Sequence, residues 1–169
     1  RLGEDASVRV VVLSGEGKSF SAGADLDWMR RNAEATRAAN LADARRFAAM
    51  LKAFHDLAKP TIALVHGAAY GGGVGLTAAA DFAIATPDAQ FALSEVKLGL
   101  VPAVISPYVI AAIGARAART LSLTAERFGA EEALRLGLVT RVVPAAELGA
   151  AAAALVGQLL ANSPAALAG

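Results

Sequence analysis

The chain has 169 residues, of which 56% are hydrophobic and 18% are charged, so it can bury a substantial core and we expect one domain over residues 1–169. Its formal net charge is +1, with acidic and basic residues interspersed, which argues against nucleic acid as a partner. The absence of cysteine excludes disulfides, thiolate metal sites and cysteine nucleophiles, and it fits a reducing compartment, so we expect a cytoplasmic protein.

Nothing in the sequence predicts insertion into a membrane. The most apolar stretch, residues 150–161, is dominated by alanine, and polar residues such as Gln158 and Asn162 interrupt or border it. No signal-peptide pattern opens the chain. Because the chain begins with Arg1, enters a strand almost at once and ends on a tail of Pro, Ala and Gly, we expect a domain that is truncated at both ends.

The first half of the chain predicts two strands, each followed by a loop and a helix. Residues 8–13 form a continuous β-branched run, which is typical of a strand buried on both faces. After a loop, the segment 26–57 has a helical composition, with apolar residues three or four positions apart. Residues 61–66 are a second short strand, and a glycine-rich turn over residues 67–73 leads into an apolar helix over residues 74–80.

The second half continues the alternation. Residues 81–85 and 90–93 are short strand candidates, separated by a Thr-Pro-Asp turn. A helix is expected to begin at Pro107, because the N–H group that proline lacks has no partner in a first helical turn. A further helix over residues 124–136 has a threonine at its N-cap and a glycine at its C-cap, and residues 138–143 are a last strand. The pattern is that of an α/β chain.

Two glycine-bearing turns follow the first two predicted strands, and each precedes a helix. They are Ser21-Ala22-Gly23-Ala24-Asp25 and Tyr70-Gly71-Gly72-Gly73. Helix starts leave backbone N–H groups unpaired and carry a positive partial charge, so a pair of them can hold an oxygen that becomes anionic during a reaction. A single turn of this kind is best explained as a tight turn and no more, but two at consecutive strand ends favour a site.

Other glycine-dependent sites fail on spacing. A phosphate-binding loop ending at Gly17-Lys18-Ser19 would need its first glycine at Val12, inside the first strand. The triple glycine lacks the spacing of a dinucleotide-binding turn, and no glycine pair flanks a serine as a nucleophile elbow requires. Neither histidine has a second ligand at metal spacing, so we expect no metal site.

Glu95 is the only carboxylate in a largely apolar stretch, directly after the strand candidate 90–93. Partial desolvation of such a group raises a carboxyl pKa, so that the group can take and give a proton near neutral pH. The alternative, equally open at this point, is a surface acid paired with Lys97 or Arg116.

Four motifs together resemble one known family in order and spacing. They are Lys18-Ser19-Phe20-Ser21-Ala22-Gly23-Ala24-Asp25, Lys59-Pro60-Thr61-Ile62-Ala63, His66-Gly67-x-Ala69-x-Gly71-Gly72-Gly73 and Ser94-Glu95-Val96-x-Leu98-Gly99. The combination is similar to the enoyl-CoA hydratase/isomerase (crotonase) family, and the similarity continues to Val139. It implies a crotonase-like (ClpP/crotonase) spiral of ββα units, of which this chain holds the core portion.

The resemblance also implies the roles of individual residues. A thioester carbonyl would be held by the backbone N–H groups of Ala24 and Gly72, which stabilise its enolate, with Glu95 as the acid and base. Lys18 would lie near the phosphates of coenzyme A, and Gly71 would contact the substrate. The adenine and pantetheine would lie along Ala22, Asp25 and Leu26. No cofactor is expected, because coenzyme A is part of the substrate.

One departure from the family pattern bears on the reaction. Typical hydratases of the family carry a second glutamate in the helix after the triple glycine, and here that residue is Gly75. Glu95 alone can still add water to a 2-enoyl-CoA, which is our first hypothesis, or move a proton between C2 and C4 as an enoyl-CoA isomerase. The segments 23–29 and 102–108 are similar to hydratases acting on methylglutaconyl- or carboxygeranoyl-type CoA esters.

A third hypothesis is that the protein is a non-catalytic member of the family that binds acyl-CoA or RNA. Gly75 favours this hypothesis, because it stands where typical hydratases carry the second glutamate. The retained Glu95 argues against loss of catalysis, and the balanced charge argues against RNA. The family resemblance also implies a homotrimer, or a hexamer built as a dimer of trimers.

Overall fold

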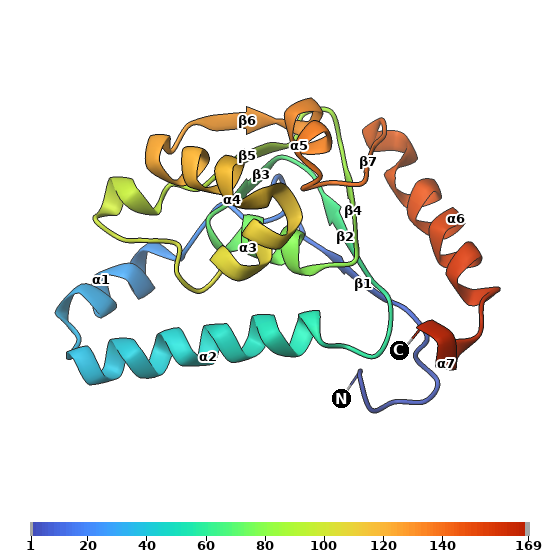
Figure 1. Ribbon diagram of the computed structural model, residues 1–169, viewed down its shortest axis with the longest axis horizontal. Helices are drawn as coiled ribbons and strands as arrows, with labels where there is room; N and C mark the ends of the chain where they lie inside the picture. Colours follow the sequence, from blue (N-terminus) through green and yellow to red (C-terminus); the bar gives the residue numbers. More distant parts are fainter. Residues whose placement is uncertain (1, 168–169) are drawn as a thin grey trace.

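The computed structural model describes residues 2–167, and of Leu26 it describes the backbone alone (Figure 1). The strands are β1 (Val11–Ser14), β2 (Thr61–Val65), β3 (Ala68–Tyr70), β4 (Phe82–Ala85), β5 (Gln90–Ala92), β6 (Arg127–Gly129) and β7 (Arg141–Val142). The helices are α1 (Leu26–Glu34), α2 (Arg37–His55), α3 (Gly72–Ala79), α4 (Ser106–Thr124), α5 (Ala130–Leu136), α6 (Leu148–Leu160) and α7 (Pro164–Leu167), with short 3-10 helices η1 (Glu95–Leu98) and η2 (Ala145–Glu147).

The chain repeats one unit, in which two consecutive strands join two different sheets and a helix follows. β2 and β4 belong to a parallel sheet with the order β1-β2-β4-β7, whereas β3 and β5 belong to a second sheet with the order β3-β5-β6. α3 follows the pair β2 and β3, and η1 and α4 follow the pair β4 and β5. This arrangement is the expected spiral of ββα units, and it brings the ends of β3 and β5 together.

The first strand differs from the prediction of a strand buried on both faces. β1 begins at Val11 rather than Val8, and inward and outward residues alternate along it, so that Val12 is 44% exposed. Within the described residues β1 pairs with β2 alone, so it forms an edge of the sheet. The composition of the run is the same for an edge strand and a central strand, so the sequence could not distinguish them.

Two predicted helices are also interrupted. The segment 26–57 forms two helices, because Ala35 is extended and Thr36 starts α2 as its N-cap, accepting a hydrogen bond from the Ala39 N–H at 3.2 Å. The predicted helix 124–136 is wrong in its first part. Thr124 ends α4, Ala125 turns left-handed with φ 49°, and β6 intervenes before α5 begins. The C-cap of α5 at Gly137, with φ 86°, is as expected.

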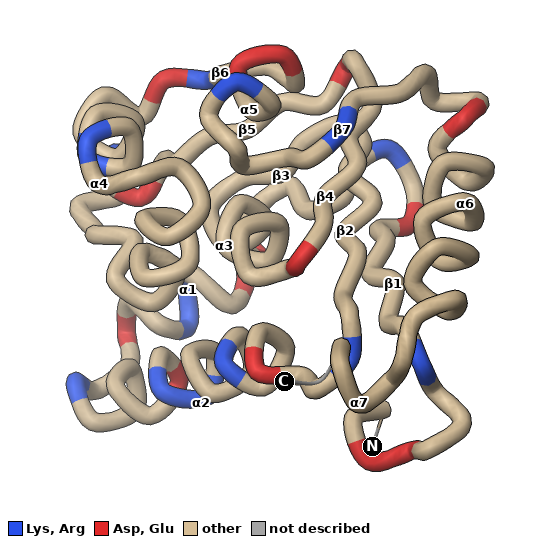
Figure 2. Tube along the Cα trace, turned by 45° about the vertical axis from the view of Figure 1, so that its right-hand side comes forward, with Lys and Arg blue, Asp and Glu red and all other residues tan. Residues whose placement is uncertain are grey.

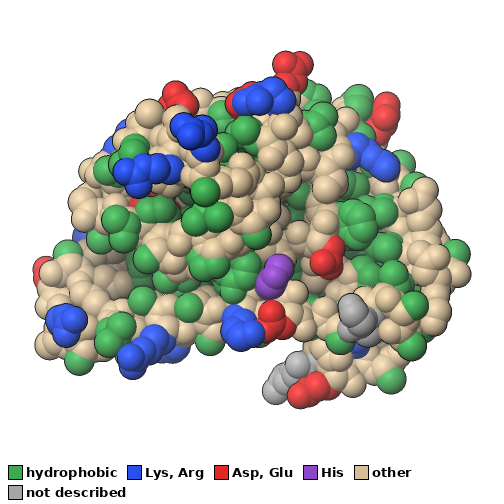
Figure 3. Space-filling view, in the orientation of Figure 1, with side chains coloured by type: hydrophobic (Ala, Val, Ile, Leu, Met, Phe, Trp, Pro, Cys, Tyr) green, Lys and Arg blue, Asp and Glu red, His purple; other side chains and the backbone are tan. Residues whose placement is uncertain are grey.

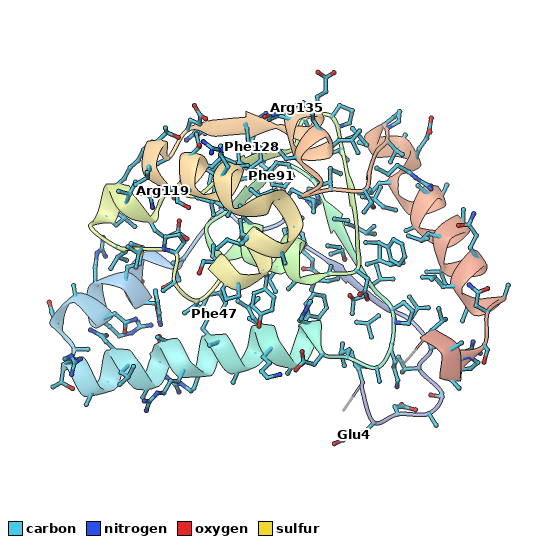
Figure 4. All side chains as sticks on the ribbon, in the orientation of Figure 1. Glu4, Phe47, Phe91, Arg119, Phe128 and Arg135 are labelled. Atoms are coloured by element: carbon cyan, nitrogen blue, oxygen red, sulfur yellow. The ribbon has the colours of Figure 1, made fainter. Side chains whose placement is uncertain are left out.

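α3 lies at the centre of the molecule and carries no charged residue in either terminal turn. Figure 2 shows acidic and basic residues spread over the surrounding elements. α2 runs beside α3 and buries Leu51 completely. On the side of α3 away from α2, Phe91 of β5 stacks on Phe128 of β6, with ring centroids 5.5 Å apart (Figure 4). The core therefore encloses α3 and fixes the position of its first turn.

The parallel sheet has its own apolar cover. Leu155 and Leu159 of α6 are buried against Ile62 of β2 and Ile84 of β4. Each such side chain contributes about 1.5–3 kcal/mol by leaving water. None of the helices in residues 2–167 combines the length and hydrophobicity that a membrane crossing requires.

Candidate functional site

The two glycine-bearing turns meet beside β3. Ser21 forms an isolated parallel bridge with Ala69, in which the Ser21 N–H donates to the Ala68 carbonyl and the Tyr70 N–H donates to the Ser21 carbonyl, both at 2.9 Å. The sequence predicted residues 67–73 as a turn, and the strand β3 inside it was missed, because a three-residue strand between glycines leaves no periodic signal. This strand is what holds the two turns side by side.

The two turns pack closely against each other where Gly73 faces Ser21. A Cβ atom built onto Gly73 would lie 2.9 Å from the Cβ of Ser21, a distance at which one of the two must move. Gly71, the N-cap of α3, has φ 51° and ψ −111°, a conformation that favours glycine. Position 71 therefore requires glycine for its backbone, and position 73 requires it for its space.

Each of the two turns leaves one backbone N–H group free. Within the described residues, the N–H groups of Ala24 and Gly72 donate no hydrogen bond. Gly72 is the first residue of α3, where the helix cannot supply an acceptor and its dipole makes the N–H group more positive. Such groups can bind an anionic oxygen, and the structure brings the turns that carry them together.

Glu95 joins the same place from the end of β5. The Gly71 N–H donates to the carbonyl of Ala92, the last residue of β5, at 2.9 Å. Three residues later, Oε1 of Glu95 lies 3.2 Å from the position of a Cβ atom built onto Gly71. The carboxylate therefore lies over the start of α3, one residue from the free N–H of Gly72.

The surroundings of Glu95 change its acidity. Its Oε2 atom is buried and has no hydrogen-bond partner, and burial raises the pKa of the carboxyl above its ordinary value. The alternative of a surface ion pair is not observed, since neither Lys97 nor Arg116 pairs with Glu95 in the described part of the chain. A carboxyl in this state can accept and return a proton near neutral pH.

The residues expected to bind coenzyme A lie on the exposed turn before α1. Lys18, Ala22 and Asp25 are all exposed, and the side chain of Leu26 lies outside the described structure. The Asp25 carboxylate caps α1 by accepting the Trp28 N–H at 2.7 Å. The N–H group of Asp25 donates no hydrogen bond within the described residues, whereas its side chain and its carbonyl, which accepts the Met29 N–H at 2.9 Å, already have structural roles.

Two apolar residues at the site were not anticipated from the sequence. Phe47 of α2 projects toward the body of the protein (Figure 4), and its ring comes within 3.1 Å of a Cβ atom built onto Gly72. Ile105, at the N-cap of α4, lies against Gly75 on the next turn of α3. Both come from segments far away in the sequence, so no local pattern could identify them.

The surface next to the site is apolar. Figure 3 shows hydrophobic side chains gathered over the middle of the face between α2 and α4. A hollow of about 360 Å³ lies along α4, with Leu93, Ile105, Val109 and Arg119 among its lining residues. Glu95, Gly71 and Gly72 do not line it. Ile105 thus lies between this hollow and α3.

The chain is similar in sequence and in fold to known proteins. The family model described as enoyl-CoA hydratase/isomerase matches residues 1–169. Carnitinyl-CoA dehydratase of Escherichia coli (strain K12) is 40% identical over 177 residues, covering 98% of this chain and 62% of that protein. An enoyl-CoA hydratase from Shewanella pealeana ATCC 700345 has a crystal structure that superposes with a TM-score of 0.96 and 48% identity, over 99% of this chain and 62% of its own.

A second solved structure, Pseudomonas aeruginosa AtuE, superposes with a TM-score of 0.95 and 41% identity, over 99% of this chain and 65% of its own. The chain therefore spans less than two thirds of the length of these relatives. The crotonase-like fold expected from the sequence is confirmed.

Proposed function

Because this chain belongs to the enoyl-CoA hydratase/isomerase family, we propose that the protein binds an acyl-CoA thioester and stabilises its enolate with the backbone N–H groups of Ala24 and Gly72. The observation that carries the proposal is that the free N–H group of Gly72 and a partly desolvated carboxyl lie at the start of α3, beside the β3 strand to which the turn carrying Ala24 is joined through Ser21. A donor of this kind contributes roughly 3 kcal/mol to a transition state in which an oxyanion develops.

The proposed reaction adds water across the C2=C3 bond of a 2-enoyl-CoA. The Glu95 carboxylate takes a proton from water while the water oxygen bonds to C3, and the electron pair of the double bond passes through C2 to the thioester oxygen. The enolate then collapses as Glu95 returns the proton to C2. Atoms and charges balance, and Glu95 ends as it began. The raised pKa of Glu95 supports the first step, because it makes the carboxylate a stronger base, and the second step is driven by the basicity of the enolate carbon that receives the proton.

Binding of coenzyme A is proposed along the turn that carries Ala24. Backbone groups of Ala22, Asp25 and Leu26 would receive the adenine and pantetheine, and the exposed Lys18 would attract the phosphates. Gly71 is proposed to contact the thioester. A residue with a side chain at this position would crowd Glu95. Methylglutaconyl- and carboxygeranoyl-type acyl groups are candidate substrates on the resemblance of residues 23–29 and 102–108.

The second candidate is an enoyl-CoA isomerase that uses the same residues. The absence of a side chain at Gly75 favours it, because moving a proton between C2 and C4 needs one carboxylate and no water. We rank hydration first, since the similar proteins named above include a dehydratase and a hydratase. A homotrimer or a dimer of trimers is proposed from the family alone.

The products distinguish the two reactions. The full-length protein is incubated with crotonyl-CoA and with 3-methylglutaconyl-CoA in ¹⁸O-labelled water, and the enoyl-thioester absorbance is followed. Hydration predicts loss of the absorbance and one ¹⁸O atom in the product. An isomerase would incorporate no ¹⁸O into its product. With a 3-enoyl-CoA as the substrate, an isomerase would instead increase the enoyl-thioester absorbance. No turnover of any of these esters would contradict both candidates.

A further inference from the structure

The space next to Gly75 is occupied by Ile105. A Cβ atom built onto Gly75 would lie 2.3 Å from Cγ2 of Ile105 and 2.7 Å from its Cβ, whereas the Ile105 Cα would be at an ordinary 3.8 Å. The Cβ of Ile105 is fixed by its backbone, so a change of rotamer cannot make room. Both residues are buried, with Ile105 only 2% exposed. Position 75 therefore excludes any side chain as long as position 105 is isoleucine.

Ile105 and Glu95 lie along the same face of α3. Gly71 and Gly75 are one helical turn apart, and the Gly75 N–H donates to the Gly71 carbonyl at 3.2 Å. Residues four apart in a helix direct their Cβ atoms to one face. Glu95 lies over the first of these glycines and Ile105 over the second. Along this face of α3, the carboxylate of Glu95 is therefore followed, one turn later, by the apolar side chain of Ile105.

We infer that Ile105 is a specificity-determining residue, because it fills the volume from which a second carboxylate on α3 would reach the substrate. The inference rests on the proposed function and deepens it. With hydrocarbon in this volume, Glu95 must both take the proton from water and return it to C2. The protein is restricted to reactions whose proton transfers a single carboxylate can complete.

The backbone at position 105 can accept a glycine, which would make room for a side chain at position 75. Ile105 is the N-cap of α4, with φ −90° and ψ −19°, a position that tolerates glycine at small cost. Ile105→Gly removes both atoms that would crowd position 75 and leaves the Cα at van der Waals distance. The double variant Gly75→Glu, Ile105→Gly therefore has room for a second carboxylate, and the single variant Gly75→Glu does not.

The test compares wild type with five variants of the full-length protein: Gly75→Ala, Gly75→Glu, Ile105→Gly and the two double variants that combine each change at position 75 with Ile105→Gly. Thermal unfolding and the pH dependence of kcat are measured for each. Gly157→Glu is the matched control, because Gly157 lies in α6 with open space at its Cβ.

Each single change at position 75 is expected to lower the melting temperature by about 5 °C or more relative to the control, because overpacking strains the core. Ile105→Gly in the same chain is expected to recover most of that loss. The double variant with glutamate is expected to show a second ionisation in its pH–rate profile that neither the wild type nor Ile105→Gly shows. A merely structural role for Ile105 would not produce this ionisation.

Any of three results would overturn the inference. The first is a Gly75→Ala variant that melts and turns over as the wild type does. The second is that the effects of the changes at positions 75 and 105 on stability simply add, and the third is that the double variant with glutamate has an unchanged pH–rate profile. Failure of the proposed function is distinguishable, since it shows as a wild type that turns over no enoyl-CoA, and the stability measurements do not depend on turnover.

Discussion

The carboxylate of Glu95 lies directly over Gly71, where a single methyl group would come within 3.2 Å of Oε1. Gly71 is also the residue whose unusual backbone starts α3 and aims the N–H of Gly72. One glycine therefore sets the space for the carboxyl and the direction of the backbone donor. The acid and base and the oxyanion-binding group of the proposed mechanism depend on the same position.

Gly71→Ala is predicted to damage stability and catalysis together. An alanine at φ 51° and ψ −111° is strained by about 1–3 kcal/mol, and its methyl group displaces Glu95. We expect kcat to fall strongly and the melting temperature to drop. Gly149→Ala is the control, because Gly149 lies in α6 with open space at its Cβ, where alanine gains about 0.5–1 kcal/mol. Equal effects of the two changes would contradict the special role of Gly71.

Glu95 is predicted to cost stability at neutral pH. Burial raises its folded-state pKa above 4.5, the ordinary value, so the folded protein binds this proton more tightly than the unfolded chain does. As the pH rises above 4.5, ionisation increasingly favours the unfolded chain, and the penalty is complete above the raised pKa. Below 4.5 both states hold the proton and the difference disappears.

The variant Glu95→Gln removes this penalty. It is expected to melt at a higher temperature than the wild type at about pH 7.5 and at the same temperature at about pH 4. Thermal unfolding at a series of pH values measures the difference, with Glu126→Gln, a change at an exposed acid, as the control. A variant less stable than the wild type at neutral pH would show that Glu95 is satisfied in the folded state.

Asp43 is predicted to hold the turn that carries Ala24. Its carboxylate accepts a hydrogen bond from the Asn32 amide of α1 at 3.3 Å and pairs with Arg46 on its own helix at 2.7 Å. The bond to Asn32 fastens α1 to α2, and most residues of α1 are otherwise exposed. Since α1 begins two residues after Ala24, loosening it should move the Ala24 N–H.

The change Asp43→Ala is expected to lower kcat/KM for an acyl-CoA ester several-fold, with part of the loss in KM. Trp28 is the single tryptophan, so its fluorescence reports the release of α1 directly. Asp56→Ala is the matched control, because Asp56 pairs with Lys52 at the other end of α2. If the two variants have the same kinetics and the same emission spectrum, Asp43 does not position the turn.

The sequence predicted the two glycine-bearing turns and Glu95 correctly as neighbours of strand ends, because glycine spacing and a lone acid in an apolar stretch are local signals. It did not predict β3, which is too short to show a period, although β3 brings the turns together. It also missed the break at Ala35, where neither glycine nor proline marks the end of α1. Residues such as Phe47 and Ile105 reach α3 through the tertiary fold, which a single sequence does not contain.

The most direct test of the account compares turnover and binding in Glu95→Gln of the full-length protein. Rates with a 2-enoyl-CoA and the affinity for a non-reacting acyl-CoA are measured for the variant and the wild type. The account predicts that kcat falls by about 10²–10⁴-fold while the affinity is unchanged, because the backbone donors and the coenzyme A contacts remain in place. A variant that keeps near-normal turnover would show that Glu95 is not the acid and base, and the account would be wrong.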